Sequence, residues 1–81
     1  MSHSEPLVLT DPKLTALAIA IGGRLLHAKP LPTGRLEFHV DGVPPDLYEQ
    51  VINDSVQVSA KRFIDAMESV LGLIASRRRP R

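Results

Sequence analysis

The hydrophobic pattern is strongest between Val58 and Ala75, near the C-terminal end of the chain. Apolar residues recur there at the i, i+3, i+4, i+7 spacing of an amphipathic helix, and they cover an arc of roughly 200°. The stripe consists of Ala60, Phe63, Ile64, Ala66, Met67, Val70, Leu71, Leu73, Ile74 and Ala75. We expect Ser59 to cap this helix and the helix to end near Arg77. Because one neighbouring helix would not cover such a wide stripe, the pattern predicts a sheet on one side and a helix or another chain on the other.

A second helix is predicted to start at Asp11-Pro12, with Asp11 as the N-cap and Pro12 at the first helical position. No charged residue follows Lys13 in this segment, so we expect it to be buried on two sides. Its predicted main face consists of Leu14, Leu17, Ala18 and Ile21. Gly22-Gly23 is expected to end the helix, because glycine accepts the left-handed conformation of a helix C-terminus.

Residues 24–29 and 35–41 predict an antiparallel hairpin, with the proline- and glycine-containing turn 29–34 between them. The second strand alternates without exception: Leu36, Phe38 and Val40 are expected to face a core. Its water-facing residues are predicted to be Arg35, Glu37, His39 and Asp41.

Three shorter elements complete the prediction. A helix over residues 45–53 is expected to bury Leu47, Tyr48, Val51 and Ile52. Residues 7–9 could add a short edge strand, and residues 56–58 could form a third short strand, which is the one in parentheses in the element order below. The fold class is therefore α+β, with a small two- to three-stranded antiparallel sheet packed against helices in the order α-β-β-α-(β)-α. We divide the chain into a flexible lead-in (1–9), a single domain (10–76) and a basic tail (77–81).

Composition narrows the possible functions. The 81 residues contain no cysteine, which excludes disulfides and thiolate chemistry and fits a cytoplasmic protein. The net charge of +1 hides an asymmetry, because without the four arginines of the tail six basic side chains oppose nine acidic ones. The apolar run 14–21 is too short to span a membrane, so no membrane association is expected.

The sequence predicts no catalytic centre and no cofactor. The serines lack a nucleophile-elbow motif, and the histidines lack the spacing of a helical metal site. Glu37, His39 and Asp41 share one strand face, with His27 on the neighbouring strand, but residues two apart on a strand lie roughly 6.5–7 Å from each other. We expect a solvated strand face there rather than a metal site.

Two surfaces are candidates for binding. Ile19, Ile64 and Leu73 lie at the margins of the helical stripes, where they either complete one crowded core or form a protein interface. Gly72, in the polar arc of the long helix, is either merely tolerated or permits another backbone to approach. Arg77, Arg78, Arg79 and Arg81 either stabilise the end of the helix or contact nucleic-acid phosphates weakly and without specificity.

Three segments resemble a small family of uncharacterised bacterial and phage-associated domains. They are the alanine-rich helix that leads through Gly22-Gly23 into Arg24-Leu25-Leu26, the strand 35–40, and the helix entry 58–63. The resemblance implies the element order and a mobile-element origin, and it implies no activity.

The sequence thus predicts a non-catalytic protein-interaction module that associates with itself, as a homodimer, or with another protein. An accessory nucleic-acid-binding protein that acts through the arginine tail is the alternative.

Overall fold

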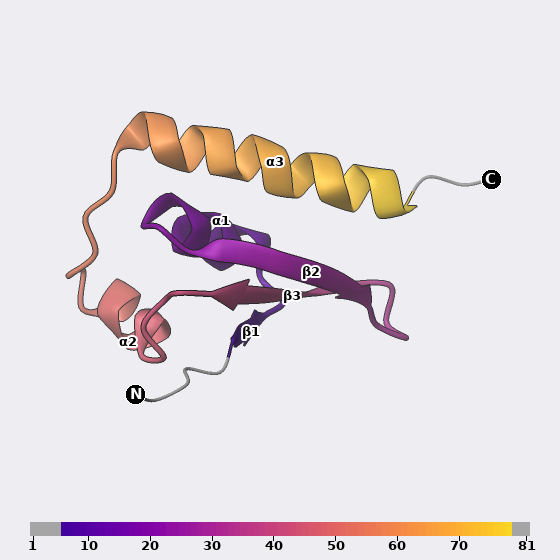
Figure 1. Cartoon of the computed structure of the whole chain (residues 1–81), viewed down its shortest axis with the longest axis horizontal. Helices are drawn as coiled ribbons and strands as arrows, with labels where there is room; N and C mark the ends of the chain where they lie inside the picture. The colour runs from indigo at the N-terminus through magenta and orange to yellow at the C-terminus, as the bar shows by residue number, and fades with distance from the viewer. Residues whose placement is uncertain (1–5, 79–81) are drawn as a thin grey trace.

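A three-stranded antiparallel sheet and three helices build the molecule, in an α+β arrangement that confirms the predicted fold class (Figure 1). The computed structural model describes residues 6–78. In chain order the elements are β1 (Leu7–Leu9), α1 (Pro12–Ala20), β2 (Arg24–Pro30), β3 (Leu36–Asp41), α2 (Leu47–Ile52) and α3 (Ala60–Arg78).

The third strand is β1, the short edge strand that the sequence allowed over residues 7–9. It pairs with β3, with Leu7 opposite Val40 and Leu9 opposite Phe38, and β2 pairs with the other side of β3. The predicted strand over residues 56–58 was wrong, because this segment is an irregular connection between α2 and α3. The predicted element order is corrected accordingly to β-α-β-β-α-α.

The alternation along β3 is confirmed and defines the two faces of the sheet. Leu36, Phe38 and Val40 are buried on the face that carries α1, whereas Glu37 and His39 are half-buried on the opposite face. β2 carries an irregularity between Leu25 and His27, which leaves Leu26 as an extra residue relative to β3.

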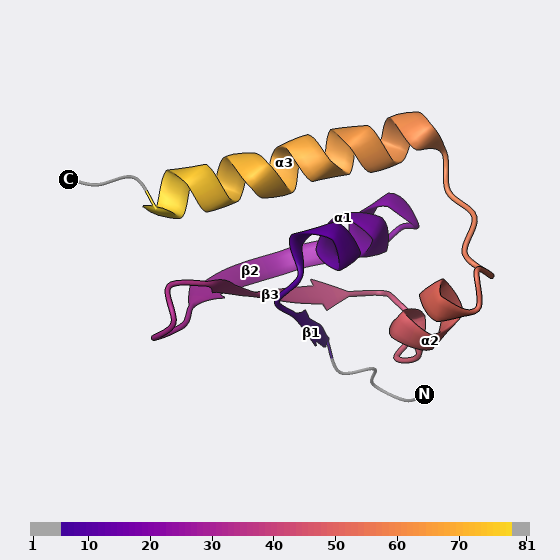
Figure 2. The ribbon, with the colours of Figure 1, turned by 180° about the vertical axis from the view of Figure 1, so that it is seen from behind.

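Helix α1 lies between the sheet and α3, as the two opposite views show (Figures 1 and 2). It is buried on two sides, as predicted, but of its predicted main face only Ala18 is fully buried. The buried residues are small: Thr15, Ala16, Ala18 and Ala20. Leu14, Leu17 and Ile21 are only partly buried. Small side chains occupy the buried positions because they let the axis of α1 lie close to both the sheet and α3.

The start of α1 has the predicted cap. The Asp11 carboxylate accepts a hydrogen bond from the Lys13 N–H at 2.8 Å, and Pro12 occupies the first helical position. The hydroxyl of the fully buried Thr15 donates to the Asp11 carbonyl at 2.9 Å, which satisfies its polar group.

Substitution of Asp11 by alanine is therefore expected to lower the free energy of unfolding by about 1 kcal/mol, because the Lys13 N–H loses its acceptor. Urea denaturation followed by circular dichroism measures this change. Asp11→Asn keeps an acceptor oxygen and should retain most of the stability. Equal losses in both variants would contradict the capping role.

Gly22 and Gly23 end α1 as predicted. Gly22 has a φ of +118°, and the Gly23 N–H donates to the Ala18 carbonyl at 2.9 Å. This bond satisfies one of the last helical carbonyls.

Helix α2 corrects a further prediction. Leu47 is buried and Val51 is half-buried, but Tyr48 and Ile52 are 62% and 64% exposed. The helix has only six residues and sits near the end of the sheet, away from α3 (Figure 1). It therefore contacts the domain along one side only.

Helix α3 packs mainly on α1. Ala66 and Val70 are buried, and Phe63, Met67, Leu73 and Ile74 are partly buried against the core. The Ser59 side chain accepts a bond from the Arg62 N–H at 3.3 Å, as expected of a cap. Leu71 does not belong to the core face on which the sequence pattern placed it, because half of it is exposed.

Candidate interaction surface on α3

One flank of α3 carries exposed apolar side chains that no element within residues 6–78 covers. Ile64 is 55% exposed and Leu71 is 50% exposed, and Ala60 and Ala75 are exposed beside them. At about 100° per residue, these four positions fall within an arc of about 60°. They form a single line along the helix, roughly perpendicular to the direction of the core.

The spacing along this line is that of a coiled-coil seam. Exposed Ala60, Ile64 and Leu71 alternate with half-buried Met67 and Ile74 at intervals of four and three residues. This is the a/d pattern of a heptad, whose side chains pack against a second helix. We call these five residues the α3 seam. Helix α3 therefore has two apolar faces: the core face, which contacts α1, and the seam, half of which is open.

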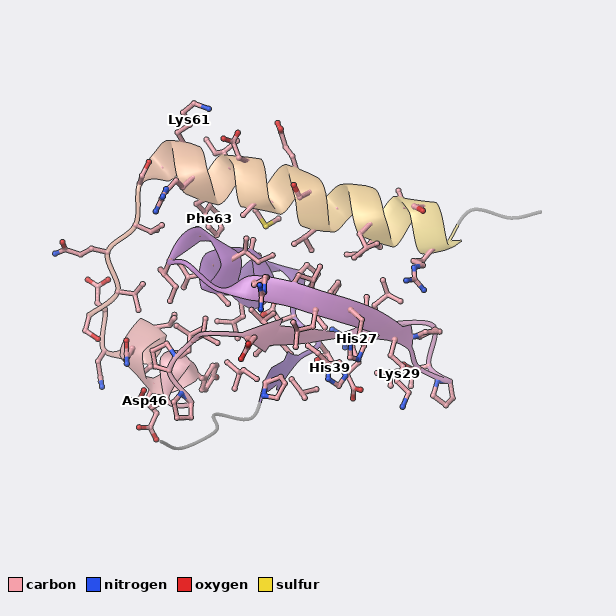
Figure 3. All side chains as sticks on the ribbon, viewed as in Figure 1. His27, Lys29, His39, Asp46, Lys61 and Phe63 are labelled. Carbon is pink, nitrogen blue, oxygen red and sulfur yellow. The ribbon has the colours of Figure 1, made fainter. Side chains whose placement is uncertain are left out.

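Opposite charges border the seam on its solvent side. Lys61 and Glu68 each follow a d-type position of the heptad, so both lie at e-type positions. Lys61 forms an ion pair with Asp65 at 3.0 Å in which both side chains are mostly exposed. Figure 3 shows Lys61 pointing away from the domain and Phe63 pointing toward α1. Among residues 6–78 the structure shows no ion pair for Glu68.

The predicted interface residues divide between two environments. Ile64 lies in the α3 seam and is exposed, as an interface residue must be. Ile19 and Leu73 are half-buried against the core and lie outside the seam. Leu71 was missed as an interface residue, although its distance of seven residues from Ile64 is the heptad signal that identifies it.

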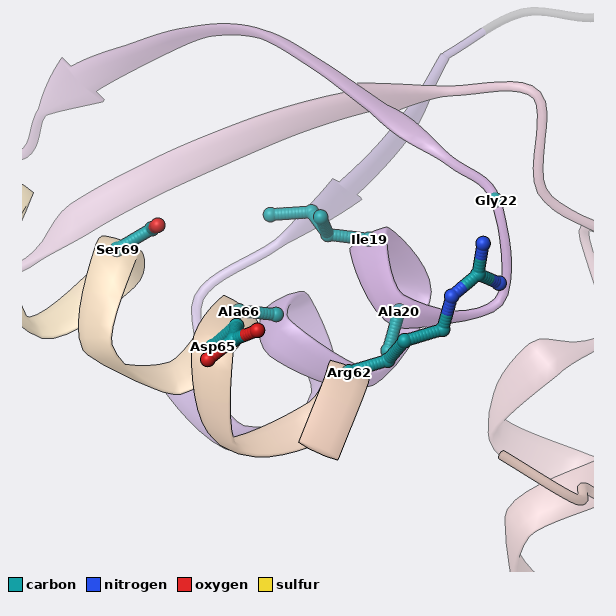
Figure 4. Close-up of a pocket in the computed structure, with 7 residues that line it drawn as sticks. All are labelled: Ile19, Ala20, Gly22, Arg62, Asp65, Ala66 and Ser69. Carbon is teal, nitrogen blue, oxygen red and sulfur yellow. The ribbon is translucent and has the colours of Figure 1, made fainter. Parts of the chain in front are cut away.

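Ile19 contributes instead to a groove on another flank of α3. This groove of about 310 Å³ lies between the end of α1 and the first turns of α3 (Figure 4). Ile19, Ala20 and Ala66 are its apolar residues. Its polar residues are Arg62, Asp65 and Ser69, and the Arg62 side chain extends toward Gly22. No hydrogen bond joins these three side chains to one another in the described part of the chain, so they do not form a catalytic relay.

A second cavity of about 250 Å³ lies beside the hairpin turn. It is lined by the turn and the start of β3 (residues 33–36), by Phe38 and Ile74, and by Thr10 and Pro12 at the entry to α1. Arg35 is its one charged lining residue, and it is exposed. One exposed arginine beside mostly apolar lining residues does not identify a chemical reaction for this cavity.

The outer sheet face brings the predicted histidines together. The rings of His27 and His39 are stacked, with centroids 4.3 Å apart, and His39 Nε2 lies 3.0 Å from Glu37 Oε1 (Figure 3). Nearly parallel rings direct their in-plane nitrogen lone pairs side by side rather than toward one ion. Within residues 6–78 no group of three histidine, cysteine or acidic side chains is arranged to hold a metal ion.

The arginine tail is described only in part. Arg77 is exposed in the last turn of α3, and the helix extends to position 78. Arg79 and Arg81 lie outside the described residues, and the contact of Arg77, Arg78, Arg79 and Arg81 with nucleic acid stays a prediction. Gly72 faces open space, since a Cβ there would meet no atom of the described residues within 4 Å.

No protein-family profile, curated protein sequence or solved structure matches this chain. In the described range 6–78, none of the helices is both long and apolar enough to cross a membrane.

Proposed function

We propose that this chain is a non-catalytic protein-interaction module that binds its partner through the α3 seam. The observation that carries the proposal is the exposure of Ile64 and Leu71 at heptad spacing on a helix of 19 residues. Isolated exposed apolar residues are ordinary, but an aligned row of them on a regular element is typical of a protein interface.

The other exposed large apolar residues support this choice of surface. Tyr48 and Ile52 lie on a six-residue helix, while Val8 and Leu26 lie on separate edge strands of the sheet. Each of these sets is smaller than the seam. Among the elements within residues 6–78, only the 19-residue helix α3 offers a row that a second helix can follow over several turns.

Quantitative affinity purification from the cells that carry the gene tests the proposal. A tagged wild-type chain is compared with Leu71→Asp and with the control Ile52→Asp, which introduces the same side chain in place of an exposed aliphatic residue on α2. We expect at least one protein, including an untagged copy of this chain, to be recovered about tenfold less with Leu71→Asp than with the control. Identical recoveries with all three baits, each shown to be folded by circular dichroism, would contradict the proposal.

A further inference from the structure

We infer that the partner of the α3 seam is a second copy of this chain, whose own α3 runs antiparallel to the first across a two-fold axis. This inference rests on the proposed function, since it names the partner and the geometry of that same surface. Three features of the described residues lead to it: the heptad spacing of the seam, the charges beside it, and the burial of the residues on its other side.

The direction of the second helix follows from what lies on each side of the seam. In a parallel pair, the e-type positions of one helix face the g-type positions of the other. The g-type positions are Phe63, Val70 and, in the last turn of the helix, the exposed Arg77. Phe63 and Val70 contribute to the core against α1 and are therefore closed to a partner. In an antiparallel pair the e-type positions of the two helices face each other on one side of the seam, where they are open on α3, and the g-type positions lie together on the other side, where each pair stays against its own core. One side of an antiparallel pair is therefore free to form contacts, whereas both sides of a parallel pair would require a closed g-type position.

The charges then select the register. The e-type residues Lys61 and Glu68 are seven positions apart and opposite in sign. An antiparallel pair that places Lys61 opposite Glu68 of the second copy forms this contact twice, because the two-fold axis repeats it. The same register places Ile64 against Met67 of the second copy and Leu71 against Ala60 of the second copy. If the two-fold axis is moved along α3 by half a heptad, Glu68 comes close to Glu68 of the second copy. Like-charge repulsion disfavours that register.

The existing contacts of these side chains do not oppose the arrangement. Lys61 pairs with Asp65 in an exposed ion pair, and such pairs contribute little. The lysine can therefore turn toward the partner at small cost, and Glu68 has no ion pair to lose among residues 6–78.

Association through the sheet is less favoured than association through α3. β1 is an edge strand of three residues, and the other edge strand, β2, contains the irregularity at Leu26 and ends in Pro30. Short edges, bulges and proline are the features that prevent strand-to-strand pairing between molecules. The overlap of the two α3 helices extends over twelve residues, about 18 Å, so we expect a reversible dimer with a dissociation constant roughly in the micromolar range.

Sedimentation equilibrium of the full chain, from about 1 µM to about 1 mM, tests the inference. We expect a monomer of 8.9 kDa at the low end and a dimer at the high end. Leu71→Asp should weaken the dimer at least about tenfold, and Leu71→Ala, which cannot disturb the helix, should weaken it by a smaller factor. The control Ile52→Asp should leave the dissociation constant unchanged.

A charge exchange tests the register. Lys61→Glu and Glu68→Lys should each weaken the dimer by roughly 3- to 10-fold at low salt, and the double exchange, which keeps the wild-type net charge, should restore it. Asp65→Asn removes the partner of Lys61 within the chain and serves as the control, with no loss expected.

The outcomes separate this inference from the proposed function. A monomer at every concentration overturns the second-copy inference, while a different protein that depends on Leu71 in the affinity purification still supports the proposed function. A dimer that is insensitive to Leu71→Asp overturns the inference that the seam is the contact. A dimer that depends on Leu71 but not on the two charges overturns the antiparallel register.

Discussion

Replacement of Phe38 by alanine is expected to lower the free energy of unfolding by about 3–5 kcal/mol. The ring is 1% exposed and lies on the central strand of the sheet, with Leu9 opposite it on β1 and Ala28 opposite it on β2. Alanine would leave a cavity under α1 that neighbouring strands cannot fill without breaking their pairing. The loss combines the transfer free energy of the ring with the cost of that cavity.

The effect is large relative to the stability of so small a domain. At about 0.05–0.15 kcal/mol per residue, a chain of 81 residues is stabilised by roughly 4–12 kcal/mol in total. Urea denaturation of Phe38→Ala should therefore show a strongly lowered midpoint or no folded baseline. Tyr48→Ala is the matched control, because this aromatic ring is 62% exposed and its removal should cost less than about 0.5 kcal/mol. Similar losses for the two variants would contradict the assignment of the core.

The sequence predicted β3 and the ends of α1 well because the local signals there are unambiguous. A strict alternation of six residues leaves one choice of buried face, and Gly22-Gly23 permits a backbone turn that other residues resist. The faces of α1 could not be predicted in the same way. Nearly every residue after Lys13 is apolar or small, so hydrophobic periodicity offers no contrast. Close packing between the sheet and α3 decided the face, and it selected Ala16 and Ala18 over Leu14 and Leu17.

The third strand illustrates a different limit. Residues 7–9 and 56–58 have similar local patterns, each with two branched or aliphatic residues around a third. Which of the two segments pairs depends on which one lies beside the edge of β3 that β2 does not occupy. Leu7 reaches Val40 on that side, whereas Val56 and Val58 are held in the connection between α2 and α3. Three residues are too few for a sequence pattern to express this preference.

The α3 seam was predictable only in part. A stripe of roughly 200° predicts more than one packing neighbour for the helix, but it does not show which half faces the core. The centre of the stripe included Leu71, which the structure places at the surface, and its margin included Leu73, which the structure packs inward. The position of α1 resolves this ambiguity, because it covers the face of Ala66 and Val70 and leaves the opposite margin, with Ile64, exposed.

The second large effect is expected at Gly23. A Cβ atom there would lie 2.7 Å from the Ala18 carbonyl oxygen and 2.7 Å from a methyl group of Val43. The carbonyl oxygen belongs to the end of α1 and already accepts the Gly23 N–H at 2.9 Å, so it cannot retreat without weakening the helix terminus. Gly23→Ala is therefore expected to lower the free energy of unfolding by about 1–3 kcal/mol through overpacking between α1 and the start of β2.

Gly72→Ala is the matched control for this prediction, since the same methyl group would there meet no atom within 4 Å. Alanine at an exposed position inside α3 should instead raise the free energy of unfolding by up to about 1 kcal/mol. Urea denaturation of both variants should thus give changes of opposite sign. A Gly23→Ala variant as stable as wild type would mean that α1 can shift away from β2, and the close packing of its small face against the sheet would then not be rigid. Because α3 rests on α1, such freedom would also change the orientation of the α3 seam relative to the sheet.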